Sequence, residues 1–291
     1  MSTKLISCLF VACFCFHLGA STRHLYSVNE TSYVSEPDPS SAVTPQNSTI
    51  DVAAQVTNGT RVTSGYEYVV SIFSYGSLRC GGWVYRPNII VTAANCVQNS
   101  GVMARTRTLS VFAKRYDLSA DYGVDQSFSV ESIATHPGYD SNTKEYDVAL
   151  LKLDRDIEVN PAKLITADIE EELTRDSELT VIGWGVDAPN SAVLPGFLQK
   201  GTVSWEPLTD CQDKYPKEIV SSSMVCTRAT SSQDACVGDG GGPLLFEQRV
   251  GEARVVGIVS WGQGCATPGK PGVYASMAAA RPWLEFASSL L

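Results

Sequence analysis

The sequence predicts an all-β fold, either a sandwich or a pair of barrels, with one helix at the C-terminal end. Three observations carry this prediction: short β-branched and aromatic runs recur from Val56 onward, turn-forming residues separate them, and helical patterns are few. Many short strands at such spacing are typical of sandwiches and barrels. At 291 residues, the chain is long enough to bury a core in one or two compact units.

The expected strands are bounded by Gly, Pro, Asn or Asp and are rich in residues that fit a half-buried pleated surface. They fall at 68–73, 89–92, 108–112, 127–135, 148–153, 179–183, 198–204, 244–247, 254–261 and 272–275. The expected helix covers 279–290, because apolar residues recur there at helical spacing: Trp283, Leu284, Ala287 and Leu290.

The first twenty residues have the pattern of a secretory signal peptide. Lys4 precedes an apolar run at 5–16, and the small residues Gly19 and Ala20 provide a cleavage site. A membrane anchor is the alternative, but the run is shorter than the roughly 18 apolar residues that a spanning helix needs. We therefore expect residues 1–20 to be removed and the protein to be secreted, with no membrane segment.

A flexible leader or pro-segment is expected at 21–55, because this stretch is rich in Ser, Thr, Asn and Pro and has little apolar periodicity. Two glycosylation sequons fall in it, at Asn29 and Asn47, and a third follows at Asn58. The folded domain then occupies 56–291.

The cysteine count predicts three disulfides. Of nine cysteines, three lie in the signal peptide, and the remaining ones are Cys80, Cys96, Cys211, Cys226, Cys236 and Cys265. An even set in an exported chain indicates disulfides, although spacing alone does not choose among the possible pairings. A metal site is disfavoured because no Cys-x-x-Cys occurs and only two histidines follow the signal peptide.

The net charge of −9 argues against nucleic-acid binding, which needs a basic face to neutralise phosphates. An acidic surface favours solubility or steers the protein towards a basic partner. Nothing in the sequence indicates a cofactor.

Six segments together resemble the chymotrypsin/trypsin family over 56–291. They are CGGWV at 80–84, TAANC at 92–96, DVALLKL at 147–153, DACVGDGGGPL at 234–244, SWGQGCA at 260–266 and KPGVYA at 270–275. The resemblance implies two six-stranded antiparallel β-barrels, at roughly 56–165 and 166–291, and a C-terminal helix. It also implies the pairings Cys80–Cys96, Cys211–Cys226 and Cys236–Cys265.

The resemblance also locates the catalytic positions, two of which have changed. The family uses a Ser nucleophile, a His base and an Asp that orients the His. The matching residues here are Gly240, Asn95 and Asp147. Glycine cannot attack a carbonyl, and an asparagine amide does not titrate near neutral pH. We therefore expect no protease activity; Ser260 is not expected to substitute as nucleophile, because no base accompanies it.

Other features of the family site are retained. The backbone N–H groups of Gly238 and Gly240 match an oxyanion hole. Asp234 matches the floor of a specificity pocket for Arg or Lys, with Gly262 and Gly272 along its walls. The pocket either keeps that affinity or is inherited and idle, and the sequence favours the second interpretation.

Activation is expected to fail. In active relatives, cleavage after a basic residue frees an amino group that pairs with a buried Asp, here Asp239. The matching segment begins at Val56, but the preceding residue is Gln55, which a trypsin-like activator does not cut after. An uncleaved chain would leave Asp239 without that partner, and an unpaired buried carboxylate is costly.

The function expected from these residues is non-catalytic protein binding. In overall type the chain resembles the glucanase inhibitor proteins of plant-pathogenic oomycetes, which lack catalytic residues and bind host endo-β-1,3-glucanases outside plant cells. That resemblance implies an effector in the host apoplast that suppresses plant defence and is a monomer outside its complex. The alternatives are a serine endopeptidase of trypsin specificity and a decoy that occupies protease inhibitors through the Asp234 pocket.

Overall fold

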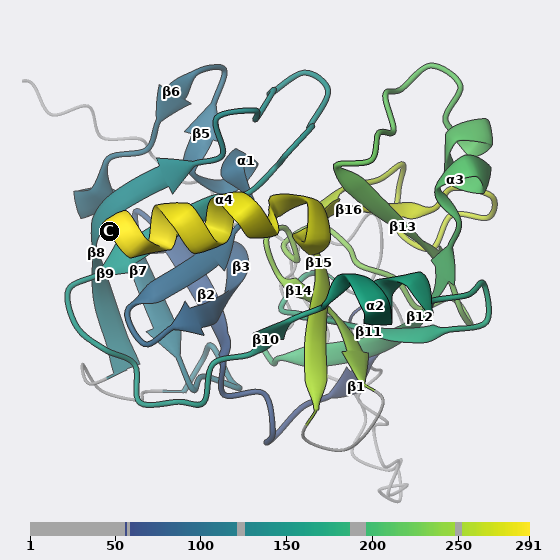
Figure 1. The fold of residues 1–291 in the computed structure, drawn as a ribbon. Coiled ribbons are helices and arrows are strands. Elements are labelled where there is room, and N and C mark those ends of the chain that lie inside the picture. The colour runs from purple at the N-terminus through teal and green to yellow at the C-terminus, as the bar shows by residue number, and fades with distance from the viewer. Residues whose placement is uncertain (1–55, 57–58, 121–125, 187–195, 248–251) are drawn as a thin grey trace, which may run out of the picture. The chain divides into compact units, whose positions relative to one another are not determined.

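Six strands of the computed structural model form a first, closed β-barrel (Figure 1). The structure describes residues 56, 59–120, 126–186, 196–247 and 252–291. The strands of the first barrel are β2 (Val69–Ser74), β3 (Ser77–Arg86), β4 (Ile89–Thr92), β7 (Leu109–Ala113), β8 (Ser127–Thr135) and β9 (Ala149–Leu153). They pair antiparallel in the order β2-β3-β4-β9-β8-β7, and β2 also pairs with β7, which closes the barrel.

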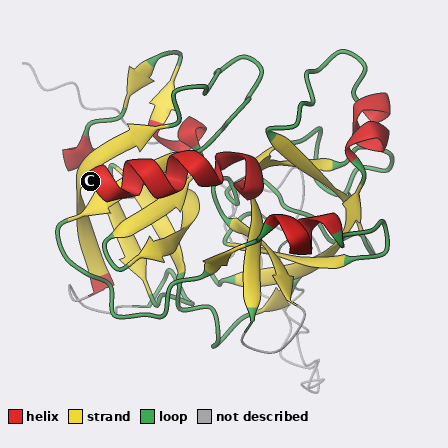
Figure 2. Cartoon of the chain, viewed as in Figure 1, coloured by secondary structure: helices red, strands yellow, loops and turns green. Residues whose placement is uncertain are grey.

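A second barrel follows in the chain. Its strands are β11 (Glu178–Gly183), β12 (Gln199–Glu206), β13 (Met224–Ala229), β14 (Pro243–Glu247), β15 (Ala253–Trp261) and β16 (Gly272–Ser276). They are joined in the order β12-β11-β14-β15-β16-β13, and pairing of β12 with β13 closes the ring. The predicted fold, two six-stranded antiparallel barrels with a C-terminal helix, is confirmed, and strands dominate the described chain (Figure 2).

The two barrels are tied together by segments that cross from one to the other. β1 (Thr60–Arg61) pairs with β12 of the second barrel, and β10 (Lys163–Leu164) runs parallel to β15. The helix α4 (Met277–Leu290) leaves the second barrel directly after β16 and lies across the first barrel in Figure 1. Near the end of α4, the Ser288 carbonyl accepts a hydrogen bond from the Arg86 side chain of the first barrel at 3.3 Å.

The cores of the barrels consist of aliphatic and aromatic side chains, and several strands, such as β4 and β9, are buried at consecutive positions. Trp83, Ile90 and Leu150 are fully buried in the first barrel, and Val181 and Leu244 in the second. Burial of such side chains stabilises by about 1.5–3 kcal/mol each. The helix α4 adds to the core through one face, and its first turn is capped by the Ser276 hydroxyl, which accepts from the Ala279 N–H at 3.1 Å.

Two strands of the barrels were not expected from the sequence, β3 and β13. In β3, Gly81 and Gly82 interrupt the β-branched pattern, which hides the strand. Both glycines are needed for close packing: a Cβ at Gly82 would lie 3.0 Å from the Val91 carbonyl, and a Cβ at Gly81 would lie 3.0 Å from the Cα of Gly242 in the second barrel. The remaining unexpected elements are short: the strands β1, β5 (Gln98–Asn99), β6 (Val102–Met103) and β10, and the helices α1 (Ala94–Val97), α2 (Ala167–Glu171), α3 (Leu208–Lys214) and η1 (Thr106–Thr108).

The predictions for the signal peptide at 1–20, the leader at 21–55 and the sequons at Asn29, Asn47 and Asn58 lie outside the described residues. Among the residues that are described, no helix has both the length and the apolar character needed to cross a membrane.

Candidate functional site

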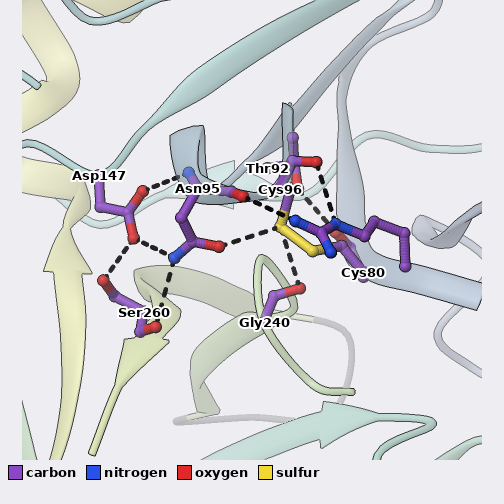
Figure 3. The surroundings of a disulfide bond; sticks show 9 residues. Cys80, Thr92, Asn95, Cys96, Asp147, Gly240 and Ser260 are labelled. Carbon is purple, nitrogen blue, oxygen red and sulfur yellow. Dashed lines mark hydrogen bonds between the residues drawn. A yellow bond between two sulfur atoms is a disulfide. The ribbon is translucent and has the colours of Figure 1, made fainter. Parts of the chain in front are cut away.

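The three residues at the predicted catalytic positions lie together where the two barrels meet (Figure 3). Asn95 belongs to α1, directly after β4, and Asp147 precedes β9. Gly240 comes from the second barrel, in the loop before β14, and its carbonyl accepts from the Gly81 N–H at 2.8 Å. Residues from 52 to 145 positions apart in the chain are thus brought to one place by the barrel contact.

Asn95 is held against Asp147 by two hydrogen bonds. The Asn95 backbone N–H donates to Asp147 Oδ1 at 2.8 Å, and the Asn95 Nδ2 donates to Asp147 Oδ2 at 2.5 Å. Ser260 completes the arrangement, because its hydroxyl donates to Asp147 Oδ2 at 2.6 Å (Figure 3). The sequence raised Ser260 only as a substitute nucleophile, whereas in the structure its hydroxyl proton is directed at a carboxylate.

This arrangement keeps the carboxylate of Asp147 and places the amide of Asn95 beside it. Asp147 is completely buried, and that burial raises the pKa of its carboxyl above the usual range, while the bonds from Ser260 and Asn95 oppose the shift. The Asn95 Oδ1 lies 3.7 Å from the Cys96 sulfur, which is a contact and not a hydrogen bond, because a disulfide sulfur has no proton. An amide in this position can orient a neighbour but cannot take a proton from one.

Gly240 is not required by the backbone at its position. A Cβ added there would meet only the Cys80 sulfur, at 3.7 Å, which is ordinary van der Waals contact. The next two residues differ: Gly241 has φ +78° and a Cβ there would collide with Thr92, while a Cβ at Gly242 would lie 2.8 Å from the Ile182 carbonyl. A serine would therefore fit at position 240, and what is missing is the reactive atom and not the space for it.

Two backbone N–H groups of the same loop match the predicted oxyanion-hole remnant. Gly238 and Gly240 both line the adjacent pocket, and Gly238 has φ +104°, a conformation that favours glycine. Neither N–H has a hydrogen-bond partner among the residues that the structure describes. Both are free to donate to a ligand oxygen.

A pocket with a volume of about 310 Å³ lies where the specificity pocket was predicted. Asp234, Gly262 and Gly272 all line it, together with the disulfide Cys236–Cys265. Gly272 is needed for close approach, because a Cβ there would lie 3.1 Å from Asp234 Oδ1. At Gly262, the nearest atom to an added Cβ lies 3.7 Å away, which is ordinary van der Waals contact.

The Asp234 carboxylate is buried at the floor of this pocket. It accepts the backbone N–H of Ala235 at 2.9 Å and that of Ala266 at 2.8 Å. Burial raises the pKa of Asp234 to about 6, and the two hydrogen bonds only partly offset that effect. Above that pH the pocket holds a negative charge that attracts a cationic side chain.

Asp239 is also buried, but it is not without partners. It accepts the backbone N–H of Cys236 at 2.8 Å and that of Gly185 at 2.7 Å, and burial raises its pKa to about 6. Val56 is fully buried within the core of the second barrel, whereas Gln55 lies outside the described residues. Two backbone donors therefore satisfy a carboxylate that was expected to be unpaired in an uncleaved chain.

The implied disulfide pairings are confirmed. Cys80–Cys96, Cys211–Cys226 and Cys236–Cys265 have Cα–Cα distances of 6.0, 6.4 and 5.2 Å, all within the usual range. The first supports the segment that carries Asn95, and the third braces the Asp234 pocket.

His136, the only histidine in the described residues, lies elsewhere. Its ring stacks on Tyr146 with a centroid distance of 4.3 Å and meets Trp283 edge-on, and its Nδ1 accepts the Gly138 N–H at 3.0 Å. These contacts account for His136 as a packing residue.

Comparison with known proteins gives one consistent family. The family model for trypsin matches residues 56–284. Trypsin delta of Drosophila melanogaster is 34% identical over 234 residues, covering 79% of this chain and 87% of the relative. Trypsin-1 of Astacus astacus is 32% identical over 71% of this chain and 86% of its own, and a trypsin of Saccharopolyspora erythraea is 33% identical over 70% and 84%.

Proposed function

We propose that this chain, which belongs to the trypsin family, is a secreted binding protein that does not hydrolyse peptide bonds. One observation carries the proposal: the nucleophile position is occupied by Gly240, where a serine would fit but no reactive atom is present. Asn95 supports it, because its amide is bonded to Asp147 and provides no base. The three disulfides and the apolar N-terminal run support secretion.

The expected loss of activity is large. Removal of the nucleophile or of the base from such a site lowers kcat by about 10⁴- to 10⁶-fold, and removal of both adds little because they act as a unit. The N–H groups of Gly238 and Gly240 would leave only a small residual rate from oxyanion stabilisation.

What remains at the site suits binding. The pocket over Asp234 offers a buried carboxylate for an Arg or Lys side chain, and the two free N–H groups offer donors for a backbone carbonyl beside it. A peptide held in this way would stay uncut. The decoy alternative, in which the protein occupies protease inhibitors, depends on this same pocket.

The names of the relatives favour the other alternative, a serine endopeptidase of trypsin specificity, over a glucanase inhibitor. That the partner is a plant endo-β-1,3-glucanase stays a prediction. So do the apoplastic location, the virulence role and the glycosylation. Glucanase inhibition is tested by incubating the purified protein with basic apoplastic glucanases and measuring both complex formation and release of sugars from β-1,3-glucan.

The central test is hydrolysis of an Arg p-nitroanilide, together with labelling by a fluorophosphonate, which reacts only with an activated serine. We expect wild type to show neither. The triple variant Gly240→Ser/Asn95→His/Gln55→Lys, in which the lysine allows the chain to be cut before Val56, should gain both hydrolysis and labelling.

Single variants are the matched controls. Gly240→Ser alone should restore little, because Asn95 supplies no base. If wild type hydrolyses the substrate at protease-like rates, and the activity co-purifies with fluorophosphonate label on this chain, then the endopeptidase alternative is correct.

A further inference from the structure

A further pocket in the second barrel shares no residue with the Asp234 pocket. It has a volume of about 290 Å³ and is formed where the end of α3, the end of β13 and the loop between β15 and β16 meet. The charged residues that line it are all cationic, namely Lys214, Arg228 and Lys270. We call it the basic pocket, because no Asp or Glu lines it although the whole chain has a net charge of −9.

Two of these cationic side chains share one buried carboxylate. Lys214 Nζ pairs with Glu206 Oε1, Arg228 Nη1 lies 3.2 Å from Glu206 Oε2, and the Glu206 side chain is completely buried. Arg175 lies 3.5 Å from the same carboxylate and also pairs with Asp210. Three cationic groups are thus grouped with two carboxylates, so one positive charge of this network stays unbalanced.

Lys270 adds a second unbalanced charge. It has no carboxylate within ion-pair distance among the residues that the structure describes. Its Nζ donates to the Lys214 carbonyl at 3.0 Å and lies 4.9 Å from the centre of the Tyr215 ring. An ammonium group has three donors, so two remain available to a ligand.

The loops that border the basic pocket are tight turns. In the turn at 267–270, the last N–H donates to the first carbonyl at 3.0 Å, and Gly269 has the φ of +74° that a type II turn requires at its third residue. A second turn at 230–233 places Ser231 and Ser232 at φ +50° and +62°, which is a strained conformation for serine. Backbone strain of this kind is typical of loops that hold a ligand.

The lining is complementary to an anion with three terminal oxygens. Lys214, Arg228 and Lys270 come from three different segments, so each can donate to a different oxygen. A sulfate or phosphate monoester offers three strong acceptors, whereas a carboxylate offers two. The volume is near the lower limit of ligand pockets, which suits one charged group with a body no larger than a sugar ring. A metal cation would be repelled by the same side chains.

We propose that the basic pocket binds a sulfate or phosphate monoester, whose terminal oxygens accept charge-assisted hydrogen bonds from Lys214, Arg228 and Lys270. The inference goes beyond the proposed function and does not depend on it. No residue that lines the basic pocket belongs to the Asp234 pocket or to the site of Asn95 and Gly240.

The test is calorimetric titration of the whole protein with glucose 6-phosphate and with glucose 6-sulfate, at constant ionic strength. Glucose is the control for the sugar, and acetate is the control for a planar anion. We expect both esters to bind saturably with a Kd of about 1 mM or below, glucose not to bind, and acetate to bind at least about tenfold more weakly. The ratio of the two ester affinities identifies which group the pocket prefers.

Lys270→Gln is the most informative variant, because Lys270 lies outside the Glu206 network and its loss leaves no buried carboxylate unpaired. It should weaken ester binding by about tenfold and change the melting temperature of the free protein by less than about 2 °C. The matched control Lys217→Gln removes an exposed lysine that follows α3 and does not line the pocket, so it should change binding by less than about twofold.

Arg228→Lys separates geometry from charge. The lysine keeps a positive charge beside Glu206 but lacks the planar fork of donors, so ester binding should weaken by about threefold or more. Three results would overturn the proposal: no saturable binding of either ester, acetate binding as tightly as the esters, or an equal loss of binding in Lys270→Gln and Lys217→Gln.

Discussion

Two adjacent regions differ in the features of the family site that they retain. One is the corner formed by Asn95, Asp147 and Gly240, and the other is the pocket over Asp234. The corner retains its backbone, its disulfide and the bonds around Asp147, and lacks only the reactive atoms. The pocket retains both its shape and its charge, including a carboxylate whose burial raises its pKa to about 6.

The difference shows which residues the fold demands. Gly238, Gly241 and Gly272 are explained by backbone conformation or close approach, so their presence says nothing about ligands. Gly240 has no such explanation, and neither has Asp234, because burial of a carboxylate is unfavourable without a use for the charge. Asp234 is therefore the residue that most directly separates a functional pocket from an idle one.

The largest effect should come from removing the disulfide of the pocket. Cys236→Ala/Cys265→Ala opens a loop with a sequence separation of 29 and should lower the free energy of unfolding by about 3–4 kcal/mol. It should also abolish benzamidine binding, because the pocket walls lose their brace. Cys80→Ala/Cys96→Ala, measured by the same denaturant titration, should cost about 3 kcal/mol and leave benzamidine binding intact. An equal loss of benzamidine binding in both double variants would show that the pocket depends on the disulfide of the corner as much as on its own.

Adjacent glycines in the corner should respond differently to alanine. Gly242→Ala places a Cβ 2.8 Å from the Ile182 carbonyl and 2.9 Å from the Asp239 carbonyl, and should lower the free energy of unfolding by about 1–3 kcal/mol. In Gly240→Ala the added Cβ meets only the Cys80 sulfur, so the free energy of unfolding should change by less than about 0.5 kcal/mol. Urea denaturation checks both, and a costly Gly240→Ala would mean that the glycine is structural.

Benzamidine binding should depend on pH through Asp234. The amidinium needs the ionised carboxylate, whose pKa is about 6, so affinity should be constant above pH 7 and fall by about tenfold per pH unit well below 6. Calorimetric titration from pH 8 to pH 5 measures this. In Asp234→Asn the affinity should be low at every pH, and a pH-independent wild type would contradict the assignment.

The smallest effect concerns His136, which lies outside both regions. Burial lowers the pKa of the imidazole below its usual value, so the unfolded chain binds the proton more readily than the folded chain. The contribution of His136 to stability is present above about pH 6.5 and is lost as the pH falls through the folded pKa. Asp234 and Asp239, whose pKa values are raised, act in the opposite direction over pH 4–6. The difference in melting temperature between wild type and His136→Phe, followed from pH 8 to pH 5, isolates the histidine.

Much of the fold could be predicted because the signals were local. β4 and β8 begin and end at the expected residues, and α4 starts only two residues before its expected beginning, where Ser276 caps it. β3 was not expected, because its paired glycines serve contacts made across the barrel and between barrels, which no local pattern records. The disulfide pairings came from the family resemblance, since spacing alone allows many.

For the site, residue identity was predictable and arrangement was not. The presence of Gly240 and Asn95 at the positions of the family's serine and histidine was evident from the sequence alone. The hydrogen bond from Ser260 to Asp147 joins residues 113 positions apart, and only the contact of the barrels creates it.

The crossed ends of the domain have a consequence for how it unfolds. β1 pairs with the second barrel although the strands that follow it build the first, and α4 emerges from the second barrel and ends on the first. A fragment cut near residue 165 would therefore separate each barrel from a segment that completes it. We expect neither half to be stable alone and the domain to melt in a single cooperative transition, with both barrels exchanging their slowest amide protons at the same rate.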